Sequence, residues 1–172
     1  MKLNAEFFHR DCLELAPDLV GKWIVRTLPD DTVLRARITE TEAYRGEEDT
    51  ACHAHRGRTA RTEILYGESG IIYVYLCYGI HWLMNVISGE REQPQGVLIR
   101  ACENFEGPGR LTKYLRIDGS FNRRSAWNNP ELWFEDDGTN CTVITDKRVG
   151  INYASEADRD RLWRFKLQKA RT

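Results

Sequence analysis

Alternating apolar and polar residues dominate the middle of the chain and predict a domain built mainly from β-strands. Residues 22–28 and 32–44 alternate in this way and are rich in β-branched side chains. They are separated by Pro29-Asp30-Asp31, residue types that favour a tight turn, so the two segments predict a β-hairpin. Further strands are predicted from apolar runs at 71–78, 82–88, 96–102 and 141–144.

Helix signals occur mainly near the edges of this strand-rich region. Asp11 is a suitable N-cap with Glu14 three residues later, and Gly21 is a suitable stop. Pro17 falls inside that span, where it would kink or shorten the helix. A second, short helix is predicted in residues 107–115, with a proline near its first turn.

The order of these elements indicates the fold class. Strands and helices do not alternate regularly, which favours an α+β fold over a doubly wound one. No repeat, low-complexity segment or linker divides the sequence. We therefore expect a single domain over residues 1–172, with a mixed, mostly antiparallel curved sheet and peripheral helices. The glycines form neither a G-x-G-x-x-G nor a Walker motif, so no nucleotide-cofactor loop is predicted.

Composition adds an expectation about the compartment. The chain has 172 residues, of which 41% are hydrophobic and 30% charged, close to the average for globular domains. No apolar run approaches the roughly 18 residues that span a bilayer, and residues 1–10 lack the core of a signal peptide. The five cysteines are widely spread without a C-x-x-C pair, which indicates free thiols in a reducing compartment. We expect a cytoplasmic protein that does not contact a membrane.

Charge is distributed unevenly although the net charge is only −1. Residues 40–49 contain five acids and one base, and three arginines follow at Arg56, Arg58 and Arg61. Residues 159–172 contain six bases and one acid. This basic tail is either the solvated face of a C-terminal helix or a contact for a polyanion, and the sequence leaves both interpretations open.

Two carboxylates continue the apolar face of the second predicted strand. With a period of two, the apolar even-numbered positions up to Ile38 continue into Glu40 and Glu42. This parity predicts that both acids project from the core side into a cleft, where desolvation raises a carboxyl pKa towards values useful for proton transfer. The alternative is a β-bulge near Thr39 that returns both acids to solvent.

Flat, polar-tipped rings are unusually dense close to these acids in sequence: Tyr44, His53, Tyr73, Tyr75 and Tyr78. Such rings can stack on a nucleobase, at about 1–3 kcal/mol per base. The alternative is ordinary packing within the sheet, because tyrosine favours strands.

Other reaction classes find less support. His53 and His55 could be combined with Glu42 as metal ligands, but the spacings of known zinc centres and of zinc deaminases are missing. A G-x-S-x-G serine-hydrolase motif is also missing. We expect no metal and no cofactor.

Five strings occur in a fixed order: ETEAY at 40–44, YVYLCYG at 73–79, MNV at 84–86, VLIRA at 97–101 and GPGRL at 107–111. In this order they resemble the alkyladenine, or methylpurine, DNA glycosylase family. RVGI at 148–151 and WRF at 163–165 are similar to the closing strings of the family, so the resemblance runs from about Asp11 to Phe165. It implies a base-excision repair enzyme that flips a damaged purine out of double-stranded DNA and hydrolyses its glycosidic bond.

The resemblance also implies roles for the reacting groups. Glu42 would be the general base that activates the attacking water, and Arg100 would help to place that water. The family uses no metal or organic cofactor. Because the tyrosine-rich segments contain no lysine, we expect a monofunctional enzyme without a Schiff-base step.

The implied base-binding residues come from several segments. Tyr44 and His53 would sandwich the flipped purine, and Tyr75 would close the pocket edge. Asn85 would lie where a guanine amino group would otherwise sit, and Tyr78 would fill the gap left in the duplex.

Phosphate contacts are expected from four arginines: Arg56, Arg58, Arg61 and Arg110. Thr62 stands where the family commonly has asparagine, which affects the contacts of the 56–61 loop. The alternative function is a DNA-lesion binding module without catalysis. The lesion preference is left open by the sequence, and we expect a monomer.

Overall fold

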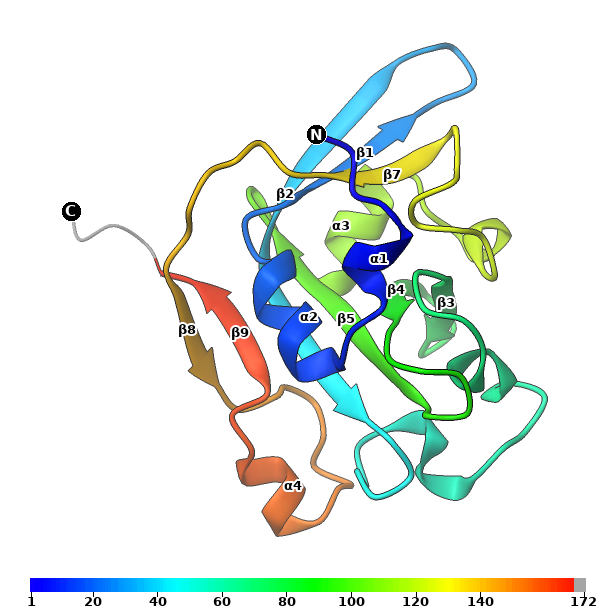
Figure 1. The fold of residues 1–172 in the computed structure, drawn as a ribbon, viewed down its shortest axis with the longest axis vertical. Coiled ribbons are helices and arrows are strands. Elements are labelled where there is room, and N and C mark those ends of the chain that lie inside the picture. The colour runs from blue at the N-terminus through cyan, green and yellow to red at the C-terminus, as the bar shows by residue number, and fades with distance from the viewer. Residues whose placement is uncertain (169–172) are drawn as a thin grey trace.

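A curved antiparallel sheet forms the centre of the computed structural model, which describes residues 1–168 (Figure 1). Its main path runs β3-β4-β5-β2-β1-β7; β6 pairs with β5, β9 with β2, and β8 with β9. The strands are β1 Trp23–Thr27, β2 Val33–Arg45, β3 Ile72–Cys77, β4 His81–Ile87, β5 Gln95–Cys102, β6 Phe105–Glu106, β7 Leu132–Glu135, β8 Val143–Asp146 and β9 Arg164–Leu167. Every strand pair within residues 1–168 is antiparallel. The expected α+β class is confirmed.

Short helices surround this sheet. The α-helices are α1 Ala5–Phe8, α2 Cys12–Leu19, α3 Pro108–Tyr114 and α4 Glu156–Asp160, and 3-10 turns cover His53–Arg56, Glu63–Tyr66 and Gly119–Phe121. Asp11 caps α2 as predicted, because its side chain accepts a hydrogen bond from the backbone of Leu13. Pro17 is accommodated within the last turns of this helix, and the chain leaves it through Gly21 at φ +90°. None of the helices within residues 1–168 is long and apolar enough to cross a membrane.

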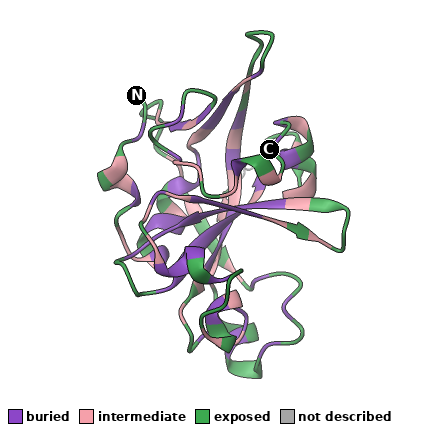
Figure 2. Ribbon diagram, turned by 90° about the vertical axis from the view of Figure 1, so that its right-hand side faces the viewer, coloured by how far each residue is buried: buried purple, intermediate pink, exposed green. Residues whose placement is uncertain are grey.

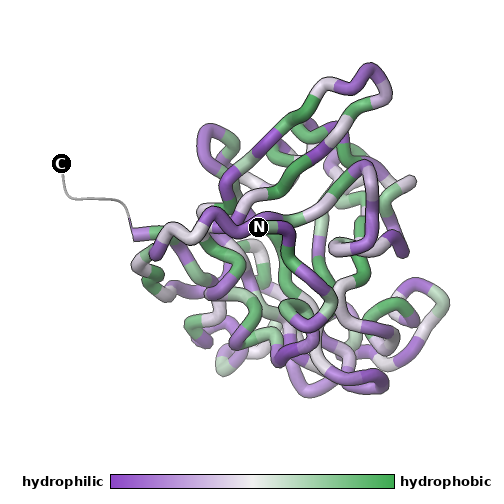
Figure 3. Tube along the Cα trace, turned by 45° about the horizontal axis from the view of Figure 1, so that its top comes forward, coloured by the Kyte–Doolittle hydropathy of each residue, from purple (hydrophilic) through white to green (hydrophobic). Residues whose placement is uncertain are grey.

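One face of the sheet carries the main hydrophobic core. Ile38, Ile72, Met84, Val97 and Ile99 project from five positions on β2 to β5 and pack with side chains of α1, α2 and α3. The central strands are accordingly buried while loops and hairpin ends are exposed (Figure 2). Hydrophobic and hydrophilic residues are interspersed along the chain, as the trace in Figure 3 shows. Neighbouring positions on each strand face opposite sides of the sheet.

A β-bulge in β2 reverses the predicted orientation of the side chains that follow it. The pairing of β2 with β5 shifts between Ile38 and Glu40 and again between Glu40 and Thr41. One extra residue moves every later side chain to the other face. Thr41 therefore continues the core side, where its hydroxyl donates to the carbonyl of Ala16. Glu42 lies on the opposite face.

The prediction that Glu40 and Glu42 project from the core side is therefore wrong. The alternative prediction of a bulge near Thr39 is correct, but its expected consequence is not, because Glu42 is completely buried. Segments outside the sheet cover its second face here, so leaving the core side does not expose the carboxylate. Glu40 is half-buried and pairs with Arg164.

The C-terminal part of the chain also differs from expectation. The last predicted strand, 141–144, lies two residues later as β8, and the predictions missed β7 and β9. The basic residues of the tail up to residue 167 lie in α4, in β9 and in the turn between them. The interpretation of the tail as the face of a C-terminal helix is therefore wrong for these residues. Residues 169–172, which carry the last two bases of the tail, lie outside the described residues.

Candidate active site

The second face of the sheet carries a cluster of polar and aromatic side chains. Tyr73 and Tyr75 alternate with core residues on β3, Asn85 does so on β4 and Arg100 on β5. Glu42 and Tyr44 join them from β2 because of the bulge. The turn around His53 and the segment 147–155 cover this face. The strand order therefore brings together residues that are far apart in the sequence.

Glu42 is held by two hydrogen bonds and one ion pair. Its Oε1 accepts from the backbone N–H of Val149 at 3.1 Å and lies 3.0 Å from Nε of Arg100. Its Oε2 accepts from the hydroxyl of Tyr44 at 2.6 Å. Burial raises the pKa of Glu42, whereas Arg100, Tyr44, Val149 and Arg148 oppose that shift by stabilising the carboxylate. A carboxylate oxygen can accept two hydrogen bonds, so Oε2 retains an acceptor position for a water molecule.

A small cavity is lined by Tyr44, whose hydroxyl donates to Glu42, and all four predicted base-binding residues contribute to it. Tyr44, His53, Tyr75 and Asn85 contribute to its wall, together with Tyr73 and residues of the neighbouring loops. Its volume is about 50 Å³. A buried water needs roughly 10–15 Å³ by this measure, so the cavity holds a few waters and no purine. A base that enters must displace part of the wall.

His53 is fixed by the aromatic residues around it. Its Nδ1 lies 2.9 Å from the hydroxyl of Tyr73, and its ring meets that of Tyr75 edge to face at 4.7 Å. Burial, together with the positive charge of Arg61, lowers the pKa of His53 to about 4. The imidazole is therefore neutral at physiological pH.

A larger cleft of about 690 Å³ opens next to the small cavity and is shared with Tyr44, His53 and Tyr75. Arg100 lines it, so this side chain extends from Glu42 to the cleft. Tyr78 lies at its edge on the hairpin between β3 and β4, with 91% of its surface exposed and a φ of +51°.

The four arginines predicted to contact phosphate occupy different positions. Arg61 and Arg110 line the large cleft, and the guanidinium of Arg61 lies over the ring of Tyr75 at 5.3 Å. Arg58 is held by Glu63 and Glu92 instead. Arg56 ends the 3-10 turn that begins at His53 and is exposed.

Several site residues were not singled out from the sequence. Val149 contributes a backbone N–H, which carries no side-chain signal. Tyr153 lines both cavities, and its hydroxyl donates to the carbonyl of Ala51 at 2.9 Å. Arg148 pairs with Asp49, 99 residues away along the chain. Only the string at 148–151 pointed to this region.

Metal ligands do not gather in the described part of the chain. Within residues 1–168, no group of three or more His, Cys, Asp and Glu side chains is arranged to hold a metal ion. Nδ1 of His55 donates to the carbonyl of Glu47 at 2.7 Å.

Comparison with protein-family models gives one match over nearly the whole chain. The model is described as methylpurine-DNA glycosylase, and it matches residues 6–107 and 103–171.

Curated relatives carry a consistent name, "Putative 3-methyladenine DNA glycosylase". The relative from Psychrobacter cryohalolentis is 42% identical, with 90% of this chain and 87% of the relative covered. The one from Borrelia garinii is 39% identical, with 96% of each chain covered. The one from Natranaerobius thermophilus is 38% identical, with 98% of this chain and 96% of the relative covered.

Proposed function

The chain belongs to the methylpurine-DNA glycosylase family, and we propose that it excises damaged purines from double-stranded DNA by hydrolysing the N-glycosidic bond. The observation that supports this most strongly is the buried carboxylate of Glu42, which accepts a hydrogen bond from Tyr44 in the wall of an aromatic cavity. The lesions that we propose are alkylated, deaminated and etheno purines. Each has a flat ring system that fits between aromatic walls.

In this proposal Glu42 is the general base. A water bound at the remaining acceptor position of Oε2 attacks C1′ of the deoxyribose and transfers a proton to the carboxylate. The bond from C1′ to the base nitrogen breaks, and its electron pair leaves with the base. The sugar develops oxocarbenium character in the transition state, which the negative charge of Glu42 stabilises.

Two neighbours prepare Glu42 for this task. Arg100 stabilises the carboxylate from the cleft side, where it can also orient the water. Burial, with further contributions from Glu42, raises the pKa of Tyr44 well above its usual value, so its hydroxyl stays protonated and donates. The raised pKa of Glu42 makes it a stronger base than an exposed carboxylate.

We propose that the aromatic cavity receives the flipped base. Tyr44 and His53 stack on the two faces of the purine, and Tyr75 bounds its edge. His53 and Tyr75 are now in contact and must separate, because the cavity is too small for a base. Asn85 donates to the carbonyl of Tyr73, which fixes its amide at the cavity wall, where it would exclude the amino group of guanine.

We propose that the large cleft receives the DNA. Tyr78 enters the duplex from the hairpin tip and occupies the space of the extruded nucleotide. Arg61 and Arg110 line the cleft and are the candidates for phosphate contacts. The contacts of Arg56 and Arg58 remain a prediction, and for Arg58 a phosphate would have to displace Glu63 and Glu92.

Release of free base under single-turnover conditions tests this function. Duplexes carrying 3-methyladenine, hypoxanthine or ethenoadenine are incubated with excess enzyme, and an undamaged duplex of the same sequence is the control. We expect release from at least one damaged duplex and no covalent complex after borohydride treatment, because no lysine takes part. Absence of release from all three would contradict the function, and a trapped complex would contradict the monofunctional mechanism.

A further inference from the structure

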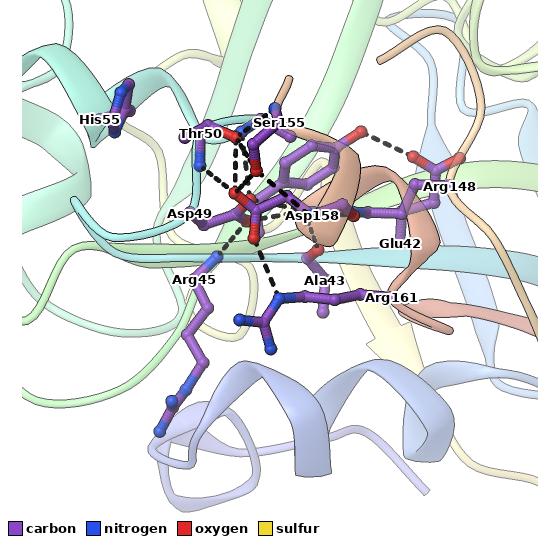
Figure 4. Close-up of polar contacts among 12 residues, drawn as sticks. Glu42, Ala43, Arg45, Asp49, Thr50, His55, Arg148, Ser155, Asp158 and Arg161 are labelled. Atoms are coloured by element: carbon purple, nitrogen blue, oxygen red, sulfur yellow. Dashed lines mark hydrogen bonds and ion pairs between the residues drawn. The ribbon is translucent and has the colours of Figure 1, made fainter. Parts of the chain in front are cut away.

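A buried ion pair lies behind the reacting groups. The side chains of Arg148 and Asp49 are 0% and 1% exposed. Nη1 of Arg148 donates to Oδ2 of Asp49 at 2.6 Å, and Nη2 donates to Oδ1 at 2.9 Å (Figure 4). Such a pair is expensive to bury and is not by itself a source of stability. Its other contacts indicate what it does.

The guanidinium of Arg148 contacts β2 next to the catalytic carboxylate. Nη1 also donates to the carbonyl of Ala43 at 3.0 Å, and Ala43 lies between Glu42 and Tyr44. The guanidinium lies between two rings, 4.9 Å from that of Tyr44 and 5.0 Å from that of Trp163. A stacked, bidentate arginine of this kind has little freedom to move. Arg148 therefore holds one face of the Tyr44 ring in place.

Backbone connectivity links the same arginine to a second partner of Glu42. Arg148 immediately precedes Val149, whose N–H donates to Oε1 of Glu42. Two of the donors that hold Glu42, the hydroxyl of Tyr44 and the N–H of Val149, are thus anchored on Arg148. Only Arg100 reaches the carboxylate from elsewhere in the contacts described above.

Asp49 extends this anchoring to the pocket wall. Its Oδ2 accepts from the backbone N–H of Arg45 at 3.0 Å, and its Oδ1 accepts from that of Ala51 at 3.1 Å. The carboxylate closes the turn between β2 and the segment that carries His53. The pair therefore joins β2, this turn and the segment 147–155.

We propose that Arg148 and Asp49 are a positioning pair, which holds Glu42 and Tyr44 in the geometry needed for water activation. This inference rests on the function proposed above. Neither side chain makes a described hydrogen bond or ion pair with Glu42; Arg148 acts on it through the ring of Tyr44, the backbone of β2 and the N–H of Val149, so we assign the pair a positioning role and not a catalytic one. Loss of the pair displaces Glu42 and slows the chemical step, while DNA binding at the hairpin and cleft continues.

The test compares two variants with a matched control. Arg148→Lys keeps the charge but loses the planar fork and the stacking, and Asp49→Asn weakens the pair from the other side. Arg26→Lys is the control, because Arg26 is also buried, lies over the ring of Phe121 at 4.7 Å and donates to the carbonyl of Glu131. In both arginines Nε is buried without a partner. Arg26 lies on β1, away from Glu42.

Three quantities are measured for each variant: the maximal single-turnover rate, the enzyme concentration that gives half of it, and the melting temperature. A misplacement of about 1 Å at a reacting group costs on the order of 10²-fold in rate, so we expect a loss of that size for Arg148→Lys and Asp49→Asn. The half-saturating concentration should not change. Arg26→Lys should keep the wild-type rate even if its melting temperature falls as far.

A second readout does not depend on activity. Tyr44 and Val149 lower the pKa of Glu42 by hydrogen bonding, and Arg100 and Arg148 lower it by their charge. Arg148→Lys retains the charge, so loss of the two hydrogen bonds should raise the pKa of Glu42 further, measured by carboxyl NMR titration. Arg26→Lys should leave it unchanged.

These readouts separate the two proposals. If wild-type enzyme releases no base, the proposed function fails, and the titration of Glu42 still decides whether the pair positions it. Wild-type rate and an unchanged Glu42 titration in Arg148→Lys would overturn the positioning role. So would an equal loss of rate in Arg26→Lys at the same loss of melting temperature.

Discussion

Burial shifts the pKa values of two side chains of the site, Glu42 and His53, in opposite directions. Burial raises the pKa of Glu42, and burial together with Arg61 lowers that of His53. In both cases the uncharged form is favoured, because a low-dielectric environment penalises either charge. The charge of Glu42 is compensated by two hydrogen bonds and the ion pair with Arg100, whereas the one described hydrogen-bond partner of the His53 ring is the hydroxyl of Tyr73. The site thus holds the carboxylate of Glu42, whose negative charge its partners stabilise, and the neutral imidazole of His53.

The neutral state of His53 can be tested directly. Its pKa of about 4 lies below the ordinary value of 6.5. As the pH falls from 6.5 towards 4, the unfolded chain takes up a proton on this residue before the folded protein does, so its contribution to stability falls in that window. An NMR titration of the His53 ring should show a midpoint near 4, and a midpoint near 6.5 would contradict the desolvated pocket.

At the level of secondary-structure elements, β2 shows why alternation placed Glu40 and Glu42 on the wrong face of the sheet. Alternation up to Ile38 correctly predicted the core side, since the side chains of Ala36 and Ile38 are in the core. The bulge at the next residues has no glycine to reveal it, and its position depends on the pairing with β5. A face assignment beyond such a point requires knowledge of the partner strand.

Strand β9 is a different case, because its signal was present in the sequence. Arg164 and Lys166 alternate with Phe165 and Leu167, and Phe165 is buried in the core. Strand β7 has the same length and buries alternate side chains, but the apolar Trp133 between Leu132 and Phe134 hides that period in the sequence.

The hairpin between β3 and β4 supplies a prediction at this scale. Tyr78 is exposed and has a left-handed backbone, which is uncommon for a tyrosine. The ring is therefore not part of the core and is free to contact an external partner. Tyr78→Ala should weaken binding to lesion duplex and slow excision, by about 1–3 kcal/mol if the ring stacks on a base.

Two further substitutions at this position control for the backbone. Tyr78→Phe retains the ring and should keep most of the wild-type activity. Tyr78→Gly suits the positive φ, so it should preserve the hairpin and still lose activity as Tyr78→Ala does. Equal affinity and rate for wild type and Tyr78→Ala would rule out the duplex-filling role.

In the whole molecule, one sheet separates the main hydrophobic core from the proposed site. One face holds the main core with its helices, and the other holds the acid, the aromatic rings and Arg100. The net charge of −1 says little about this second face, because Arg61, Arg100 and Arg110 are gathered in the cleft. Local charge at the cleft, rather than the total, is what a phosphate backbone would meet.

The limits of sequence-based prediction follow from the same arrangement. Strands β1 to β5 could be located within a few residues, because each has a clear period and bounding turns. The contacts that complete the site could not, since Val149 and Arg148 meet Glu42 and Asp49 across 107 and 99 residues. Such contacts depend on how β8, β9 and α4 return the chain to β2, which no local pattern encodes.

Because the two faces are separate, a substitution at Glu42 should change chemistry without unfolding the protein. Glu40→Gln is the matched control, since Glu40 lies two residues away on the same strand but pairs with Arg164 at 3.2 Å. The measurement is the single-turnover rate of base release by wild type, Glu42→Gln and Glu40→Gln on the best damaged duplex. Loss of a general base costs about 10²–10⁴-fold in rate. We predict a loss of that size for Glu42→Gln and a near wild-type rate for Glu40→Gln; a wild-type rate in Glu42→Gln would contradict the catalytic role of Glu42.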